Sequence, residues 1–233
     1  MGTIPFQQLN YTYNAIQKAS KRGLASQSKL ASGQKIQSAK DNAASLAISI
    51  NLDAEIRSLQ QASRNTSEGI NVLRTAEGAM SSNQDALIRM KELAVQAGST
   101  TLSDDQRAMI QEELEGLKEH MGQVAGTTEY NGQNLVDGSQ PDMTFQVGSG
   151  NSPDDQIVVE LPDITPAALG VDGGSVLTSG DAHALLDQVD AAMDTLAEAQ
   201  TEVGAGINRM ESAFDNTQES IVNNSATLSQ LRD

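Results

Sequence analysis

The chain has 233 residues, of which 38% are hydrophobic but only 3% aromatic, and it carries a formal net charge of −16 at pH 7. It contains no cysteine, which excludes disulfides, thiol catalysis and cysteine-bound metals. No apolar stretch approaches the roughly 18–20 residues that span a membrane. So small an aromatic content is typical of an extended helical bundle, whose narrow apolar stripes are filled by Leu, Ile, Met and Ala.

The charge is distributed unevenly along the chain. Residues 1–40 contain six Lys and Arg and no Asp or Glu, so the remainder carries all 31 acidic residues against nine basic ones. A basic, acid-free start is typical of a segment that meets an acidic surface or of a targeting peptide. Residues 1–40 lack a secretory apolar run, and the acidic remainder would repel phosphate. We therefore expect no nucleic acid among the partners, and no membrane.

Proline and glycine divide the chain into predicted elements. Residues 6–140 and 167–233 contain no proline, as long helices require. We expect a first helix at about 6–31, ended by Gly33, and a second at about 41–97. A third, at about 104–126, begins with the capping box of Ser103 and Gln106, in which each side chain binds the other's backbone amide.

A short β insertion interrupts the helices. Residues 143–147 alternate in polarity and residues 156–161 are rich in β-branched side chains, with turn residues between them. This pattern predicts a β-hairpin within a region of about 131–180. A last helix follows at about 181–231.

Apolar residues recur in these helices at alternating steps of three and four. This spacing predicts stripes that only partner helices can bury, as in a coiled coil. In the last helix the stripe comprises Val189, Met193, Leu196, Val203, Ile207, Met210, Phe214, Ile221, Leu228 and Leu231, interrupted by Gln200, Thr217 and Asn224. The second helix contributes Leu52, Ile56, Leu59, Thr66, Ile70, Leu73, Met80, Leu87 and Ala94, and the third Ile110, Leu114, Leu117, Met121 and Val124. The predicted fold is mainly α: an elongated antiparallel helical bundle, or coiled-coil rod, with a small β-hairpin insertion.

No residue pattern indicates catalysis. His120 and His183 lie far apart without a motif around them, and neither Asp154-Asp155 nor Asp172-Gly173-Gly174 has the ligand spacing of a calcium loop. We expect no cofactor, no metal and no enzymatic activity.

Several motifs resemble those of bacterial flagellin. They are Leu30 to Ala44 (LASGQKIQSAKDNAA), Gln61 to Asn65 (QASRN), Thr75 to Ala79 (TAEGA), Arg89 to Gln96 (RMKELAVQ), Tyr130-Asn131-Gly132, Phe145 to Gly148 (FQVG) and Leu169-Gly170-Val171. They follow in the family's order through nearly the whole chain. The resemblance implies a core helix and spoke in residues 1–40 and a rod domain in 41–233, without large outer domains. It also implies export by the flagellar type III apparatus with a chaperone, an extracellular location on the flagellum, and self-assembly through helical contacts.

The resemblance further implies a host partner, Toll-like receptor 5. Motif alignment assigns its recognition to Arg89, Leu93 and Glu113, with Gln96 and Ile110 as neighbours. Arg89 and Leu93 are four residues apart and therefore share a helix face.

The chain departs from the family pattern at both ends. It has Ile4-Pro5-Phe6-Gln7 near its start, and it stops at Leu231-Arg232-Asp233, about where the family's C-terminal core helix begins. Without that helix Leu9, Ile16 and Leu24 would have no partner, so we expect the chain as given to be monomeric with a frayed first helix. Two alternatives to a filament subunit remain: a hook–filament junction protein, and a secreted or cell-surface helical module that binds a ligand through its hairpin.

Overall fold

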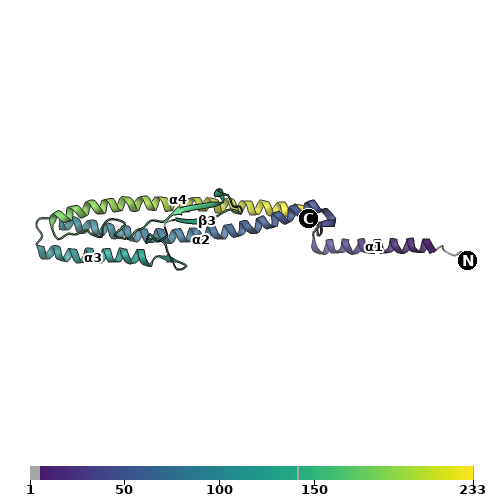
Figure 1. The fold of residues 1–233 in the computed structure, drawn as a ribbon, viewed down its shortest axis with the longest axis horizontal. Coiled ribbons are helices and arrows are strands. Elements are labelled where there is room, and N and C mark those ends of the chain that lie inside the picture. Colours follow the sequence, from purple (N-terminus) through teal and green to yellow (C-terminus); the bar gives the residue numbers. More distant parts are fainter. Residues whose placement is uncertain (1–5, 141, 233) are drawn as a thin grey trace. The chain divides into compact units, whose positions relative to one another are not determined.

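The structure, a computed structural model, describes residues 6–140 and 142–232 and is mainly helical (Figure 1). Its elements are α1 (Phe6–Ser32), α2 (Ala39–Ala97), α3 (Asp104–Thr127), β1 (Glu129–Tyr130), β2 (Gln133–Asn134), β3 (Asp142–Gln146), the 3-10 turn η1 (Pro153–Asp155), β4 (Gln156–Glu160) and α4 (Ser179–Arg232). The bounds of the four α-helices in the described residues lie within two residues of those predicted. The departures from the family at Ile4 and Pro5, and the side chain of Leu9, lie outside what is described.

The chain divides into two compact units. Residues 1–58 and 219–233 form the first unit, and residues 59–218 form the second. α2 and α4 contribute to both units, because each of them crosses a boundary. The predicted division between a core helix with spoke and a rod domain at residue 40 stays a prediction.

In the second unit α2 and α4 run antiparallel and side by side (Figure 1). Hydrogen bonds mark the antiparallel direction, because the residue number falls along α2 as it rises along α4. They join Gly98 to Ser179, Lys91 to Asp190, Gln84 to Gln200, Arg74 to Glu211 and Ser63 to Gln218. α3 returns along α2 after the short turn at residues 98–103. This arrangement confirms the predicted antiparallel bundle.

The predicted stripes form the core of the second unit. On α4 fully buried side chains recur every seven residues, at Val189, Leu196, Val203 and Met210, and Leu185 and Ala192 are buried beside them. Leu73, Met80 and Leu87 on α2 and Leu114 and Met121 on α3 are equally inaccessible. Burying side chains of this size contributes roughly 1.5–3 kcal/mol each, so the stripes dominate the stability of the unit.

Thr217, which interrupts the apolar pattern, is also buried in this stripe. It is only 6% exposed, and its hydroxyl donates to the carbonyl of Val147, 3.3 Å away. A buried hydroxyl that finds an acceptor avoids the cost of desolvation. The interruption therefore ties α4 to the hairpin instead of weakening the stripe.

The predicted hairpin is confirmed: β3 and β4 pair antiparallel, with Met143 opposite Val159 and Phe145 opposite Ile157. Glycines on the helices allow it to approach closely. A Cβ on Gly206 would lie 2.9 Å from Val159 Cγ2, and a Cβ on Gly69 would lie 2.7 Å from Phe145 Cδ1.

A second, smaller hairpin was not predicted. β1 pairs with β2 across the two-residue turn Asn131-Gly132, in which both residues have positive φ, 52° and 77°. Asn-Gly is the sequence that most favours such a turn, because both residues tolerate the left-handed region. The strands have only two residues each, too short for a polarity pattern to reveal them.

In the first unit α1 ends at Ser32, and Gly33 has φ of 69°, the left-handed residue expected after a helix. Lys29 Nζ lies 2.8 Å from Asp41 Oδ1, and the backbone amide of Lys35 donates to the carbonyl of Arg232 at 2.5 Å. The stripe is less buried here, since Ile221, Leu228 and Leu231 keep part of their surface accessible. Among the described residues, no helix is long and apolar enough to cross a membrane.

Candidate functional site

The predicted receptor face lies on neighbouring surfaces of α2 and α3. Arg89 of α2 donates from Nε and Nη2 to Glu113 Oε1 of α3, at 2.8 and 2.6 Å, and from Nη1 to Glu92 Oε2 at 2.8 Å. These carboxylates raise the pKa of Arg89, first through the hydrogen bond with Glu92 and then through that with Glu113. The structure thus brings Arg89 and Glu113 together, with both side chains about half exposed.

The apolar members of the predicted site are placed differently. Leu93 is only 1% exposed and Ile110 7%, and both belong to the hydrophobic core. Gln96 is exposed, seven residues from Arg89 and on the same face of α2. Leu93 and Arg89 therefore lie on the same side of α2, but Leu93 is buried and Arg89 is accessible. Of the five predicted residues, Arg89, Gln96 and Glu113 have side chains that a partner could contact. The receptor-binding role of all five residues stays a prediction.

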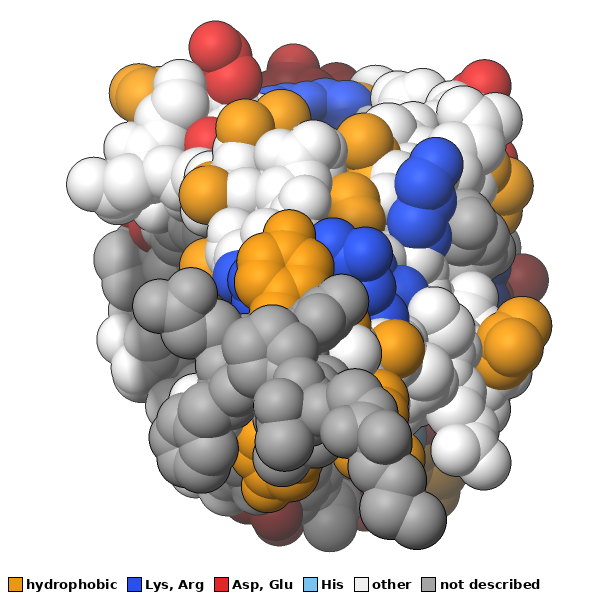
Figure 2. Space-filling model, turned by 90° about the vertical axis from the view of Figure 1, so that its right-hand side faces the viewer, with side chains coloured by type: hydrophobic (Ala, Val, Ile, Leu, Met, Phe, Trp, Pro, Cys, Tyr) orange, Lys and Arg blue, Asp and Glu red, His pale blue; other side chains and the backbone are white. Residues whose placement is uncertain are grey.

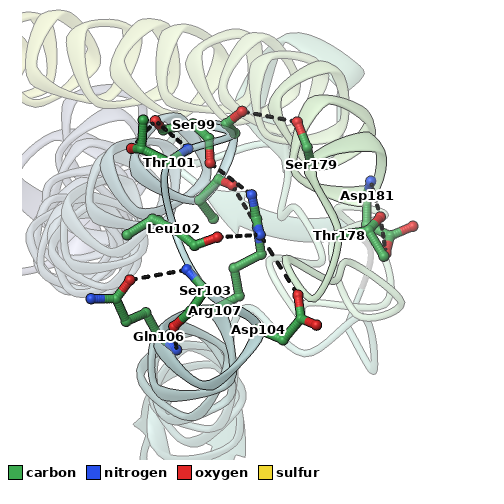
Figure 3. Close-up of polar contacts among 12 residues, drawn as sticks. Ser99, Thr101, Leu102, Ser103, Asp104, Gln106, Arg107, Thr178, Ser179 and Asp181 are labelled. Carbon is green, nitrogen blue, oxygen red and sulfur yellow. Dashed lines mark hydrogen bonds and ion pairs between the residues drawn. The ribbon is translucent and has the colours of Figure 1, made fainter.

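A buried arginine holds the turn between α2 and α3 (Figure 3). Arg107 donates from Nε to the carbonyl of Ala97 at 3.1 Å, from Nη1 to Leu102 at 2.9 Å and from Nη2 to Ser99 at 2.7 Å. The carbonyls at the end of a helix lack partners within the helix, and a cation there is favourable for the helix dipole. The guanidinium thus supplies both hydrogen-bond donors and positive charge at the end of α2.

The same turn carries two helix caps, which Figure 3 also shows. The capping box predicted at Ser103 and Gln106 is present in full: Gln106 N donates to Ser103 Oγ, and Ser103 N donates to Gln106 Oε1 at 3.0 Å. Thr178 caps α4 by accepting from Asp181 N at 3.1 Å. The three helix ends that meet here are therefore closely tied by polar contacts.

A buried lysine performs a similar task further along α3. Lys118, 6% exposed, donates from Nζ to the carbonyls of Asp172 and Gly174 at 2.8 and 2.6 Å and to Glu115 Oε1 at 3.1 Å. It fixes the loop that leads to α4. Sequence reasoning missed both Lys118 and Arg107, although a signal existed: each lies three or four residues from apolar members of the α3 stripe.

An open groove of about 340 Å³ lies among α2, the small hairpin and β3. Glu68 is its only ionisable side chain besides Tyr130, and amides and apolar groups line the rest. It offers no nucleophile beside a base. Within the described parts of the chain, no three His, Asp or Glu residues come close enough to hold a metal ion. The groove therefore suits packing or binding rather than chemistry.

Comparison with known proteins gives consistent matches. The family model of the bacterial flagellin N-terminal helical region matches residues 7–141. A flagellin of Halalkalibacterium halodurans is 32% identical over 212 residues, which cover 91% of this chain and 78% of that protein.

Two solved structures share the fold. The crystal structure of Bacillus cereus flagellin aligns with a TM-score of 0.60 at 23% identity, covering 66% of this chain and 88% of the other. A putative flagellar hook-associated protein from Vibrio parahaemolyticus aligns with a TM-score of 0.68 at 16% identity, covering 82% and 99%. Because two differently described proteins share this fold, the fold alone does not separate their roles, and the sequence match carries the assignment.

Proposed function

Because this chain belongs to the bacterial flagellin family, whose members are structural proteins and not enzymes, we propose that it assembles with copies of itself into the flagellar filament after export by the flagellar type III apparatus. The family places the chain in the bacterial flagellum. The observation that supports assembly best is the match to a flagellin over 91% of this chain. The apolar stripes on α2 and α4 are buried within one chain, so contacts between copies would use side chains that stay exposed.

Mass spectrometry of sheared, purified filaments from the source bacterium tests this role. A filament subunit is expected to supply the dominant peptides, including those from the buried stripes of α2 and α4. A hook–filament junction protein, the alternative that shares the fold, would be present only in trace amounts relative to the main subunit. Trace recovery, or complete absence from filaments that are otherwise intact, would reject the proposal.

We propose in addition that Arg89, Gln96 and Glu113 contact Toll-like receptor 5, while Leu93 and Ile110 support them from below. Three observations favour this division between residues that contact the receptor and residues that support them. Two carboxylates hold the Arg89 guanidinium in place while about half of its side chain stays accessible, so little side-chain entropy remains to be lost on binding. Gln96 extends the accessible face by two helical turns. Leu93 on α2 and Ile110 on α3 belong to one hydrophobic core cluster, which joins the two helices that carry Arg89 and Glu113.

Receptor signalling by purified variants in reporter cells tests this proposal. An arginine anchor at an interface contributes about 2 kcal/mol or more, so Arg89→Ala is expected to raise the half-maximal concentration about 30-fold. Arg74→Ala is the matched control, because Arg74 is also exposed on α2 and pairs across helices, with Glu211. Equal potency of the two variants would remove Arg89 from the site without affecting the filament proposal.

A further inference from the structure

Asn131 and Gly132 are the only Asn-Gly pair in the sequence, and they form the two-residue turn of the small hairpin. Both residues are exposed. Within the described part of the chain, no hydrogen bond engages the Asn131 side chain or the Gly132 amide. Glycine has no Cβ, so little hinders its nitrogen from approaching the carboxamide of the asparagine before it. The pair therefore has the composition and the accessibility that deamidation requires.

The other asparagines are held more firmly. Backbone amides inside an α-helix bond to carbonyls four residues earlier, which keeps them from attacking a side chain. Among the residues described, the asparagines outside the helices are Asn131, Asn134 and Asn151. The side-chain amide of Asn134 already donates to a carboxylate oxygen at 2.6 Å. Asn151 is exposed, but the amide of the next residue, Ser152, donates to the Asp155 carboxylate at 3.1 Å.

The closed turn holds the reacting groups apart. Asn131 has φ of 52°, in the left-handed region, where the following nitrogen points away from the side chain. Ring closure needs that nitrogen to swing toward the side chain, so the reaction starts from an opened turn. The hairpin that must open has only two residue pairs, Glu129 with Asn134 and Tyr130 with Gln133. A hairpin so short is marginal on its own, and such segments open far more often than the core unfolds.

We propose that Asn131 is a site of spontaneous deamidation. The Gly132 nitrogen forms a bond with Asn131 Cγ while the bond from Cγ to Nδ2 breaks, and ammonia leaves with the proton of the Gly132 amide. Water then opens the cyclic imide at either of its two carbonyls. Opening at the side-chain carbonyl gives aspartate, and opening at the main-chain carbonyl gives isoaspartate, in which the main chain runs through Cγ. The sequence of steps consumes water and needs no other reactant.

The products change the groove of about 340 Å³ that Asn131 lines. Either product adds a carboxylate beside Glu68. Basic side chains are seen next to hydrophobic ones on the face shown in Figure 2, but the second unit, which contains the groove, has seven Lys and Arg against 26 Asp and Glu. The new charge therefore meets net repulsion. Isoaspartate also lengthens the main chain, which a two-residue turn cannot absorb without a change of register. Deamidation should thus loosen the hairpin that forms one wall of the groove.

Timed incubation of the full chain at neutral and mildly alkaline pH, followed by peptide mapping with mass spectrometry, tests the proposal. Asn131 is expected to convert to aspartate and isoaspartate before Asn151 does, and faster in urea than in the folded chain. Ion-exchange chromatography should show a species with one more negative charge, which Asn131→Gln should lack because glutamine closes a less favourable ring. The Leu135 amide, which donates to the Thr128 carbonyl at 3.0 Å, should lose protection from hydrogen exchange in the modified chain.

Ser152→Gly is the matched control, because it creates a second Asn-Gly pair whose glycine amide still faces the Asp155 carboxylate. Circular dichroism confirms that the variants keep their helices. In this variant Asn151 is expected to react more slowly than Asn131, and equal rates would overturn the role of the free Gly132 amide. If Asn131 stayed intact in the folded chain and converted only in urea, or if the acidic species grew equally in Asn131→Gln, the proposal would be overturned.

Discussion

Replacing Arg107 by Met should destabilise the bundle far more than the loss of an ordinary surface charge. Met keeps most of the apolar volume of the arginine stem but donates no hydrogen bond. The change leaves the carbonyls of Ala97, Ser99 and Leu102 without their donor. The side chain is only 9% exposed, so water does not simply take its place.

The size of the effect follows from these contacts. A hydrogen bond to a charged group contributes about 1.5–3 kcal/mol, and the three bonds of one guanidinium are not additive. Ser99 lies in an exposed turn where water can reach its carbonyl, so we expect a total loss of about 3 kcal/mol. For a chain of this size that corresponds to a fall in Tm of roughly 6–12 °C.

Urea denaturation and thermal melting, followed by circular dichroism, measure this loss. Arg74→Met is the control: its ion pair with Glu211 is exposed, and such pairs contribute about 0–1 kcal/mol. Arg107→Lys should retain part of the stability, because an ammonium keeps the charge but lacks the planar fork that reaches three acceptors. If Arg107→Met lost no more than Arg74→Met, the argument that this arginine holds the turn would be refuted.

Three further changes probe other parts of the fold. Leu93→Ala should lower the free energy of unfolding by about 2–5 kcal/mol in urea titrations, since the Leu93 side chain is buried in the core. A loss smaller than that of the control Arg74→Met would contradict this burial. Gly69→Ala should cost about 1–3 kcal/mol in the same titration, because the added methyl meets Met210 and Phe145; unchanged stability would show that these side chains move aside. Hydrogen bonds from Lys29 and Ser38 lower the pKa of Asp41 to about 2. The stability that Asp41 contributes is therefore present above its ordinary pKa of 3.8 and is lost as the pH falls toward 2. The carboxyl chemical shift of Asp41 in NMR should titrate near pH 2, and a midpoint near 3.8 would exclude the contact.

Helix bounds were predictable because they depend on local chemistry. The capping box at Ser103 and the glycine at position 33 act within a few residues of themselves, and the structure shows both as expected. The stripe on α4 was equally predictable, because a heptad pattern of apolar residues over about six repeats is buried when the helix packs against partner helices.

The unpredicted features depend on contacts between distant segments. The sequence near Lys118 does not indicate that its hydrogen-bond acceptors are the carbonyl oxygens of Asp172 and Gly174, more than fifty residues away. Alignment could place Leu93 within a site but could not show that its side chain is buried in the hydrophobic core. The Arg89–Glu113 pair was predicted to share a site, and its geometry required the register of two helices that only the structure supplies.

The antiparallel register of α2 and α4 also sets the order of folding. Ser63 contacts Gln218, so 155 positions of chain separate the two ends of that contact. At a synthesis rate of roughly 5–20 residues per second, the interval between the two residues lasts about 8–30 s. Throughout it the apolar stripe at this end of α2 lacks its partner segment of α4, and closing so long a loop is slow even when the chain is complete. We therefore expect this end of the α2–α4 pairing to form last, and a factor that binds the chain before then meets an α2 stripe that α4 does not yet cover.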